Sequence, residues 1–327
     1  MPAIVDSDLA RMRADLLFSG AERNRKLSRF WALLILAAVI ASAGVIGDST
    51  ATVIGAMIVA PLMTPILGTV LSVVSGDGRN LAISATLVVT GSIVVVLVAI
   101  AIGELVPFPI DATTSSQVAG RIHPHLIDLV AALATGAVGA FALVRSDVSD
   151  TLPGVAIAIS LVPPLAVVGL TLESGYPHES TGALLLFVTN VAAILLSGLV
   201  VMALYRVRTI AMQGPRRHRL SGRASTIVIV AAVVALAIPL AAASKRINAD
   251  QQNQSNVNTV AQRWAAVRGW QIVEADPQNG GILVRAIGPL PIPDPQSFRA
   301  ALDAAGLRST SVRLELTPIE EANLPAK

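Results

Sequence analysis

Two proline pairs lie inside long apolar segments, where proline changes the chemistry of the backbone. Pro61 and Pro65 are four residues apart, and Pro163 and Pro164 are adjacent. A proline inside a helix has no N–H to donate and clashes with the carbonyl four residues earlier, at a cost of about 3 kcal/mol. We therefore expect both segments to kink or break at these prolines.

A helix broken inside a bilayer persists only where it is packed in protein or lines a wet cavity. Its free carbonyls and half-helix ends can then bind an ion or a polar solute near the midplane. The residues predicted to line such a pathway are Pro61, Thr64, Pro65, Ser160, Pro163, Pro164 and Asn190. In the alternative interpretation the prolines only shape packing, Gly55 and Gly68 allow close helix approach, and Asn190 joins two helices by a hydrogen bond.

Two further groups of polar residues could do chemistry near the ends of the apolar segments. Asp48 and Asp150 are either gates for a cation or ordinary helix N-caps. His123, His125 and Asp128 combine imidazole and carboxylate, which suits a divalent metal or proton transfer, although the intervening proline forbids a regular helical face. We find no metalloprotease, phosphate-loop or hydrolase motif and no cysteine. We therefore expect neither an enzyme nor a cofactor.

The composition indicates that the elements carrying these residues are membrane helices. Hydrophobic residues make up 54% of the 327 residues and charged residues 14%, against about 25% charged in a typical soluble domain. Segments of about 20 apolar residues are long enough to cross a bilayer as helices. Seven are predicted, near Phe30–Gly47, Ala51–Ser75, Leu81–Gly103, Ile127–Val144, Leu152–Leu172, Ala183–Tyr205 and Ala224–Ala243.

The distribution of basic residues predicts the orientation. With the N-terminus in the cytoplasm, 14 Lys and Arg residues fall in cytoplasmic segments and 3 on the opposite side. We therefore expect a multi-pass protein of the plasma (inner) membrane with a cytoplasmic N-terminal segment (1–29), a membrane domain (30–205), a basic cytoplasmic loop (206–223), a seventh span (224–243) and an extracytoplasmic domain (248–327). The basic loop fits contact with anionic lipid rather than nucleic acid.

The chain also shows an internal repeat at a shift of 102 residues. This shift aligns Asp48 with Asp150 and Pro61 with Pro163. Each copy contains three spans, so the second copy must enter from the opposite side, which makes the repeats (30–103 and 127–205) inverted as in many secondary transporters.

The run from Gly55 to Gly68, together with Val162 to Leu170, resembles a bacterial and archaeal hydrophobic membrane family known as domain of unknown function 389. The resemblance covers roughly residues 30–205. It implies an integral membrane protein and supplies no substrate, cofactor or catalytic residue.

The last 80 residues predict a small α+β domain. Helical spacing in residues 257–267 is followed by two strands, a helix capped by Asp294 and ended by Gly306, and a one-sided strand with Val312, Leu314 and Leu316. The fold class is thus an all-α membrane bundle with an appended α+β domain. Our leading functional hypothesis is a transporter of an unknown small solute or ion. The alternative is a non-transporting envelope scaffold or sensor, and self-association into a homo-oligomer is open in both.

Overall fold

The computed structural model describes residues 6–145, 161–205, 207, 249, 252–278 and 281–319. The chain divides into two units, Met1–Ser244 and Lys245–Lys327. Each unit is described by itself.

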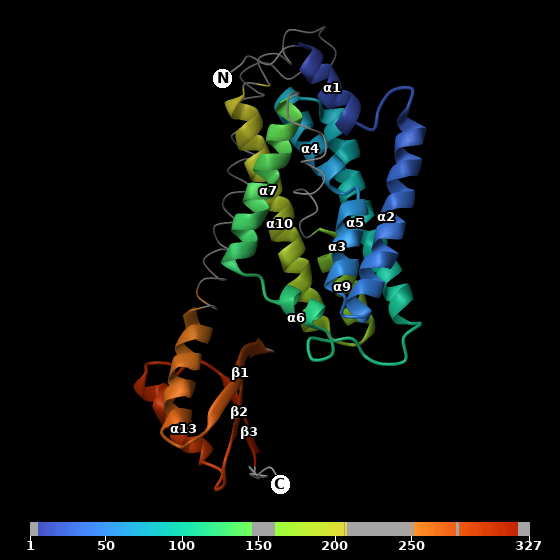
Figure 1. The fold of residues 1–327 in the computed structure, drawn as a ribbon. Coiled ribbons are helices and arrows are strands. Elements are labelled where there is room, and N and C mark those ends of the chain that lie inside the picture. The colour runs from blue at the N-terminus through green and yellow to red at the C-terminus, as the bar shows by residue number, and fades with distance from the viewer. Residues whose placement is uncertain are drawn as a thin grey trace, which may run out of the picture. The chain divides into compact units, whose positions relative to one another are not determined.

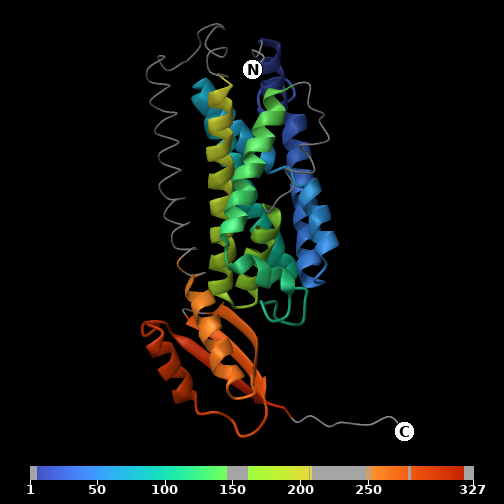
Figure 2. The same ribbon diagram turned by 60° about the vertical axis from the view of Figure 1, so that its left-hand side comes forward.

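The described part of the first unit is a bundle of helices (Figures 1 and 2). The helices are α1 (Asp6–Leu16), α2 (Arg23–Ile46), α3 (Thr50–Val59), α4 (Met63–Ser75), α5 (Gly78–Gly103), α6 (Ser116–Ile122), α7 (Leu126–Val144), α9 (Val162–Glu173) and α10 (Pro177–Leu204). The longest of them alternate buried and exposed apolar residues, as expected for helices with one face in protein and one in lipid.

Within the described residues, four helices are long and apolar enough to cross a membrane: α2, α5, α7 and α10. The bent pair α3 and α4 makes a fifth if it counts as one span. The predicted count of seven is therefore not confirmed. The predicted span Leu152–Leu172 is described only from residue 161, as the 12-residue helix α9, and the predicted span Ala224–Ala243 lies outside the described residues.

The helices run between two ends of the bundle, named here the α1 end and the α6 end (Figure 1). At the α1 end, the Arg11 side chain of α1 donates to the carbonyl of Leu143 at the close of α7. At the α6 end, Ser115, the N-cap of α6, donates to the carbonyl of Val45 at the close of α2. It follows that α2 runs toward the α6 end and α7 toward the α1 end.

Helices α4 and α9, which carry the proline motifs, each span about half of the bundle. At 1.5 Å per residue they are about 20 and 18 Å long, whereas α10 is about 42 Å long. Helix α4 ends at the α1 end, where α1 packs on it, and α9 ends at the α6 end, where the Ser174 hydroxyl accepts from the Ile110 amide. The two half-length helices therefore run in opposite directions.

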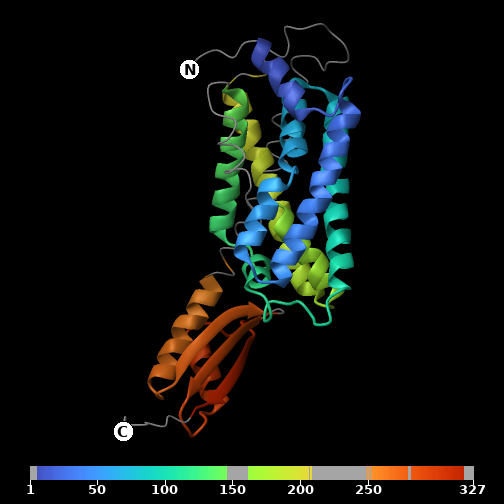
Figure 3. The ribbon, with the colours of Figure 1, turned by 45° about the vertical axis from the view of Figure 1, so that its right-hand side comes forward.

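The second unit is a three-stranded sheet with helices on one face (Figure 3). Residues 252–266 are helical and are followed by β1 (Gln271–Gln278), β2 (Gly281–Gly288), α13 (Pro295–Ala304) and β3 (Val312–Pro318), in the predicted order. Strand β2 is central, antiparallel to β1 and parallel to β3. Asp294 caps α13 as predicted, because its carboxylate accepts from the Gln296 amide at 3.0 Å.

A separate hydrophobic core holds the second unit together. It joins Trp264 of the first helix and Phe298 of α13 to the helix-facing residues Val284 and Ala286 of β2. The Trp264 and Phe298 rings are 5.0 Å apart, and the Trp264 indole donates to the Ser297 hydroxyl. The opposite face of the sheet carries the charged residues Glu274, Arg285 and Glu315.

Candidate functional site

The first proline motif breaks the helix as the sequence predicts. Helix α3 ends at Val59, the backbone of Ala60 is extended (ψ 126°), and α4 begins at Met63 with a bend of 43°. Pro61 has no N–H for the carbonyl of Met57, and the Thr64 amide donates to the Pro61 carbonyl at 3.2 Å. The C-terminal end of α3 and the N-terminal end of α4 thus meet at residues 60–62.

The second proline motif forms the beginning of α9. The helix starts at Val162, so Pro163 and Pro164 occupy its first turn. The first turn of a helix has N–H groups without helical partners, and proline avoids this problem because it has none. Residues 161–171 are all buried, so these prolines let a helix begin in apolar surroundings. Ser160 lies outside the described residues.

Both motifs lie at the level of the middle of α5. Gly91 is the fourteenth of the 26 residues of α5, and a Cβ on it would lie 3.2 Å from Leu62, within the first break. A Cβ on Gly169 would lie 2.5 Å from the Val96 carbonyl oxygen and from Ala99. Helices α5 and α9 run in the same direction. Counting back seven residues along each helix from this contact brings Val162 level with Gly91. The two half-length helices therefore start at the same depth.

Asn190 lies at this depth as well. A Cβ on Gly198 of α10 would lie 3.2 Å from Val70 and 3.6 Å from Leu67 of α4. These two helices also run in the same direction, and moving back eight residues in each brings Asn190 level with residues 60–62. Asn190 is 2% exposed and is the fourteenth of the 28 residues of α10. The structure thus brings Pro61, Thr64 and Asn190 to one level of the bundle.

Two contacts between residues 30–103 and 127–205, the predicted repeats, correspond to each other under the shift of 102 residues. The contact of Gly169 with Val96 becomes the contact of Leu67 with Gly198, and both are present. Thr69 and Thr171 correspond in the same way, and each hydroxyl donates to the carbonyl four residues earlier in its helix. Such an exchange is what a two-fold relation between the copies produces.

Asp48 is a helix cap, but not of the helix that follows it. Ser49 is the N-cap of α3, since its side chain accepts from the Thr52 amide. The Asp48 carboxylate instead accepts from the Ser116 hydroxyl at 2.8 Å and the Gln117 amide at 3.1 Å, at the N-terminus of α6. The hydrogen bond from Ser116 is the largest cause of the lowered pKa of Asp48. Asp150, its predicted counterpart, lies outside the described residues.

The His123, His125 and Asp128 group has a structural use. Asp128 accepts from the His125 amide at 2.8 Å, and the two residues form a capping box at the start of α7. Within the part of the chain that the structure describes, no group of three or more His, Cys, Asp or Glu side chains could hold a metal ion. Helix capping is therefore the role that the described contacts give to His125 and Asp128.

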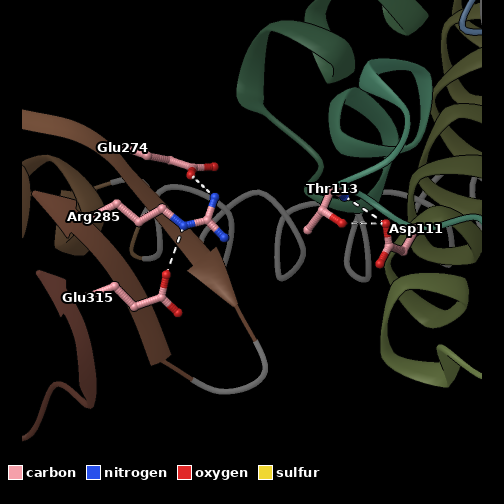
Figure 4. A network of polar contacts seen from close by, with 5 residues as sticks. All are labelled: Asp111, Thr113, Glu274, Arg285 and Glu315. Atoms are coloured by element: carbon pink, nitrogen blue, oxygen red, sulfur yellow. Dashed lines mark hydrogen bonds and ion pairs between the residues drawn. The ribbon is translucent and has the colours of Figure 1, made fainter. Parts of the chain in front are cut away.

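A polar cluster at the α6 end was missed in the sequence. Asp111 accepts from the amide and hydroxyl of Thr113, at 2.9 and 2.8 Å (Figure 4). Burial opposes its ionisation, but hydrogen bonds from Thr113 and Thr114 outweigh burial and lower the pKa of Asp111. The interaction of Tyr176 with Asp111 raises the pKa of the Tyr176 phenol. The Ile110 and Ala112 amides donate to Ser174 and Glu179, and these two bonds fasten the 104–115 loop to the turn between α9 and α10 and to the first turn of α10.

Thr135 was also missed. It is the middle residue of α7 and only 4% exposed. A hydroxyl in the centre of an apolar span is a signal that the sequence offered, because polar side chains at that depth face the protein interior.

A bundle of apolar helices with a broken helix at mid-depth is the construction of a multi-spanning membrane protein. Residues 57–196 match the model of the family described as "Domain of unknown function (DUF389)", so this part of the chain is similar to that family, as the sequence resemblance indicated. An uncharacterized protein of Methanocaldococcus jannaschii is 35% identical over 175 residues, which cover 54% of this chain and 53% of that protein. The chain thus spans about half the length of the curated relative it matches. No solved structure matches the chain.

Proposed function

We propose that the protein moves a small solute or ion across the membrane along a pathway that passes the level of residues 60–62, Val162 and Asn190. The observation that carries the proposal is that two half-length helices begin at the same depth and run in opposite directions. Half-helices of this kind are the usual binding element of secondary transporters. The proposal concerns binding and movement, not catalysis.

The proposed architecture is an inverted repeat of residues 30–103 and 127–205. The opposite directions of α4 and α9 support it, as does the exchange of the Gly169–Val96 and Leu67–Gly198 contacts. A two-fold axis in the membrane plane gives both features together. With the span predicted at 224–243, this architecture has seven crossings.

The half-helix ends suggest the chemistry of the solute. The end of α3 presents carbonyl oxygens, including that of Met57, which suit a cation or a hydrogen-bond donor. The starts of α4 and α9 carry the positive end of the helix dipole, which suits an anion or an acceptor. Thr64, half-buried, and Asn190 add a hydroxyl and an amide at the same level. This set fits a small zwitterionic solute, or an anionic solute moved together with a cation.

Substituted cysteines test whether the level of the breaks is wet. The chain has no native cysteine, so Thr64→Cys and Asn190→Cys each provide a single thiol. A transport pathway predicts that a small cationic methanethiosulfonate in the aqueous phase labels both. The matched control is Val95→Cys in α5, which is fully buried and one turn from Gly91. If Thr64→Cys and Asn190→Cys react no faster than Val95→Cys, the midplane is dry, and the scaffold or sensor hypothesis replaces transport.

Flux into proteoliposomes tests the function directly. Suitable probes are sodium, chloride and glycine, which represent a cation, an anion and a zwitterion. We expect at least one probe to enter faster than in protein-free vesicles. We expect Asn190→Leu, which removes the amide and keeps the size, to lower that rate about tenfold. Transport at protein-free rates for all three probes, by protein that retains its helical content, would contradict the proposal.

The proposed location is the plasma membrane, with the N-terminus in the cytoplasm and residues 248–327 outside it. The charge distribution described above supports this orientation. A reporter that is active only when exported, fused after Ala243, should be active. Activity of a cytoplasmic reporter at the same position would reverse the assignment.

A further inference from the structure

The two edges of the sheet in the second unit differ in how they are protected. Strand β1 contains Pro277, and its pairing with β2 is irregular between Ile272 and Glu274. Proline and bulges are the devices by which proteins prevent an edge strand from pairing with another chain. Strand β3 has its only proline at its last residue, Pro318, so residues 312–316 form an edge that no other described strand pairs with.

The hydrogen bonds of β3 define which residues face outward. Ser311 accepts from the Ile282 amide at 2.9 Å, and the Ile319 amide donates to Gly288 at 2.8 Å. Each residue of a strand directs its N–H and C=O groups to one side, and the side alternates along the strand. The odd-numbered residues of β3 therefore direct their N–H and C=O groups toward β2. Val312, Leu314 and Leu316 therefore direct their N–H and C=O groups away from the sheet.

Charges alternate across the exposed face of the sheet toward this edge. Arg285 of β2 pairs with Glu274 of β1 at 2.5 Å and with Glu315 of β3 at 2.9 Å (Figure 4). The order across the strands is acid, base, acid. A strand added beyond β3 would continue the alternation if it placed a base opposite Glu315.

We propose that β3 pairs antiparallel with β3 of a second copy of this chain, with Leu314 opposite Leu314. In this register all three outward-facing residues meet outward-facing residues, since Val312 lies opposite Leu316. Between them, Arg313 of each copy lies opposite Glu315 of the other. The pairing joins two three-stranded sheets into one of six strands and is independent of the transport proposal.

Charge complementarity selects this register. The neighbouring registers that also match outward-facing residues pair Val312 with Leu314 or Leu314 with Leu316. The first places Arg313 opposite Arg313, and the second places Glu315 opposite Glu315. Like charges directly opposite each other destabilise a sheet, whereas opposite charges stabilise it. The sequence of β3 is thus self-complementary only about Leu314.

A single cysteine at the two-fold axis tests the pairing in the full-length chain in its host membrane. Opposed residues of a hydrogen-bonded antiparallel pair have Cα atoms about 5.5 Å apart, within the range of a disulfide. Under mild oxidation we expect Leu314→Cys to give a product of twice the chain mass. The matched control is Thr317→Cys, exposed on the same strand, whose two copies would be about 20 Å apart and should remain monomeric.

The charge pairs give a second readout. Adding Arg313→Glu to Leu314→Cys should lower the cross-linked fraction roughly fivefold, because it places Glu opposite Glu315 twice. Arg313→Lys should retain it. If Leu314→Cys impairs folding, co-production of Arg313→Cys and Glu315→Cys chains should give the mixed dimer in excess over either homodimer.

Three results would overturn the pairing. In the first, Leu314→Cys and Thr317→Cys cross-link to the same extent. In the second, Arg313→Glu leaves the cross-linking of Leu314→Cys unchanged. In the third, the product has a mass that is not twice that of the chain. Absence of any product from both Leu314→Cys and the mixed pair would do the same.

Discussion

Alanine substitutions at three helical glycines should have graded effects on stability, because the glycines differ in what a new methyl group would meet. At Gly169 the methyl would lie 2.5 Å from the Val96 carbonyl oxygen and from Ala99. Ordinary contact begins near 3.4 Å, so α5 and α9 must separate by about 0.9 Å. Overpacking of this kind costs about 1–3 kcal/mol, which exceeds the gain of about 1 kcal/mol in helix propensity. The difference makes Gly169→Ala destabilising by up to about 2 kcal/mol.

The other two glycines serve as controls within the same helical bundle. At Gly91 the nearest atoms are the far ends of the Leu34, Leu62 and Phe30 side chains, at 3.1 to 3.4 Å, which can shift by a few tenths of an ångström. Gly91→Ala should be close to neutral. Gly55 has no atom within 4 Å of the added methyl, so Gly55→Ala should stabilise the protein by up to about 1 kcal/mol.

The assay is unfolding of the purified protein in detergent micelles by added dodecyl sulfate, followed by circular dichroism. The expected order of midpoints is Gly55→Ala, then wild type and Gly91→Ala together, then Gly169→Ala. Equal midpoints for Gly169→Ala and Gly91→Ala would refute the close α5–α9 contact. The assignment of Val162 to the level of Gly91 would fail with it.

Three further predictions concern the polar caps. The pKa of Asp48 is below its ordinary 3.8, so ionised Asp48 favours the docked α6 above about pH 4, and this contribution is lost as the pH falls through the lowered pKa. Proteolysis in the 104–122 region should therefore become faster in acid. Asp48→Asn, which keeps a hydrogen-bond acceptor, should remove that acid dependence. Arg11→Ala should speed hydrogen exchange in α1 roughly tenfold, because a charged hydrogen bond to Leu143 is lost, while Arg25→Ala, at an exposed position, should not. Asp128→Ala should lower the free energy of unfolding by about 1 kcal/mol, because it removes the cap of α7. Added zinc should leave the thermal stability of the wild type unchanged, and a zinc-dependent shift would support a metal site.

Helix breaks and helix starts that depend only on neighbouring residues could be predicted from the sequence. The break at Pro61 follows from the missing N–H of proline, and the start of α13 follows from Asp294 and Pro295, regardless of what surrounds them. The order of elements in the second unit follows in the same way, because alternation and helical spacing are properties of neighbouring residues.

Features that depend on tertiary contact were not predictable. Asp48 caps α6, which begins 68 residues later in the chain, and nothing near Asp48 indicates this partner. Gly55 and Gly68 are equivalent as sequence, but a methyl on Gly68 would meet Ser84 at 2.9 Å whereas Gly55 faces open space. Close approach is therefore seen at Gly68, whereas no described atom lies within 4 Å of a methyl group on Gly55.

The two short helices bear on how the proposed pathway opens. Helix α1 precedes the first copy of the proposed repeat and contacts the last turn of α7, which belongs to the second copy. Helix α6 precedes the second copy, and its N-cap Ser115 holds the last turn of α2, which belongs to the first. Each short helix thus joins the two copies at one end of the bundle only. In the proposed transport mechanism, contacts at one end of the bundle must loosen while those at the other end persist, which is the condition that alternating access requires.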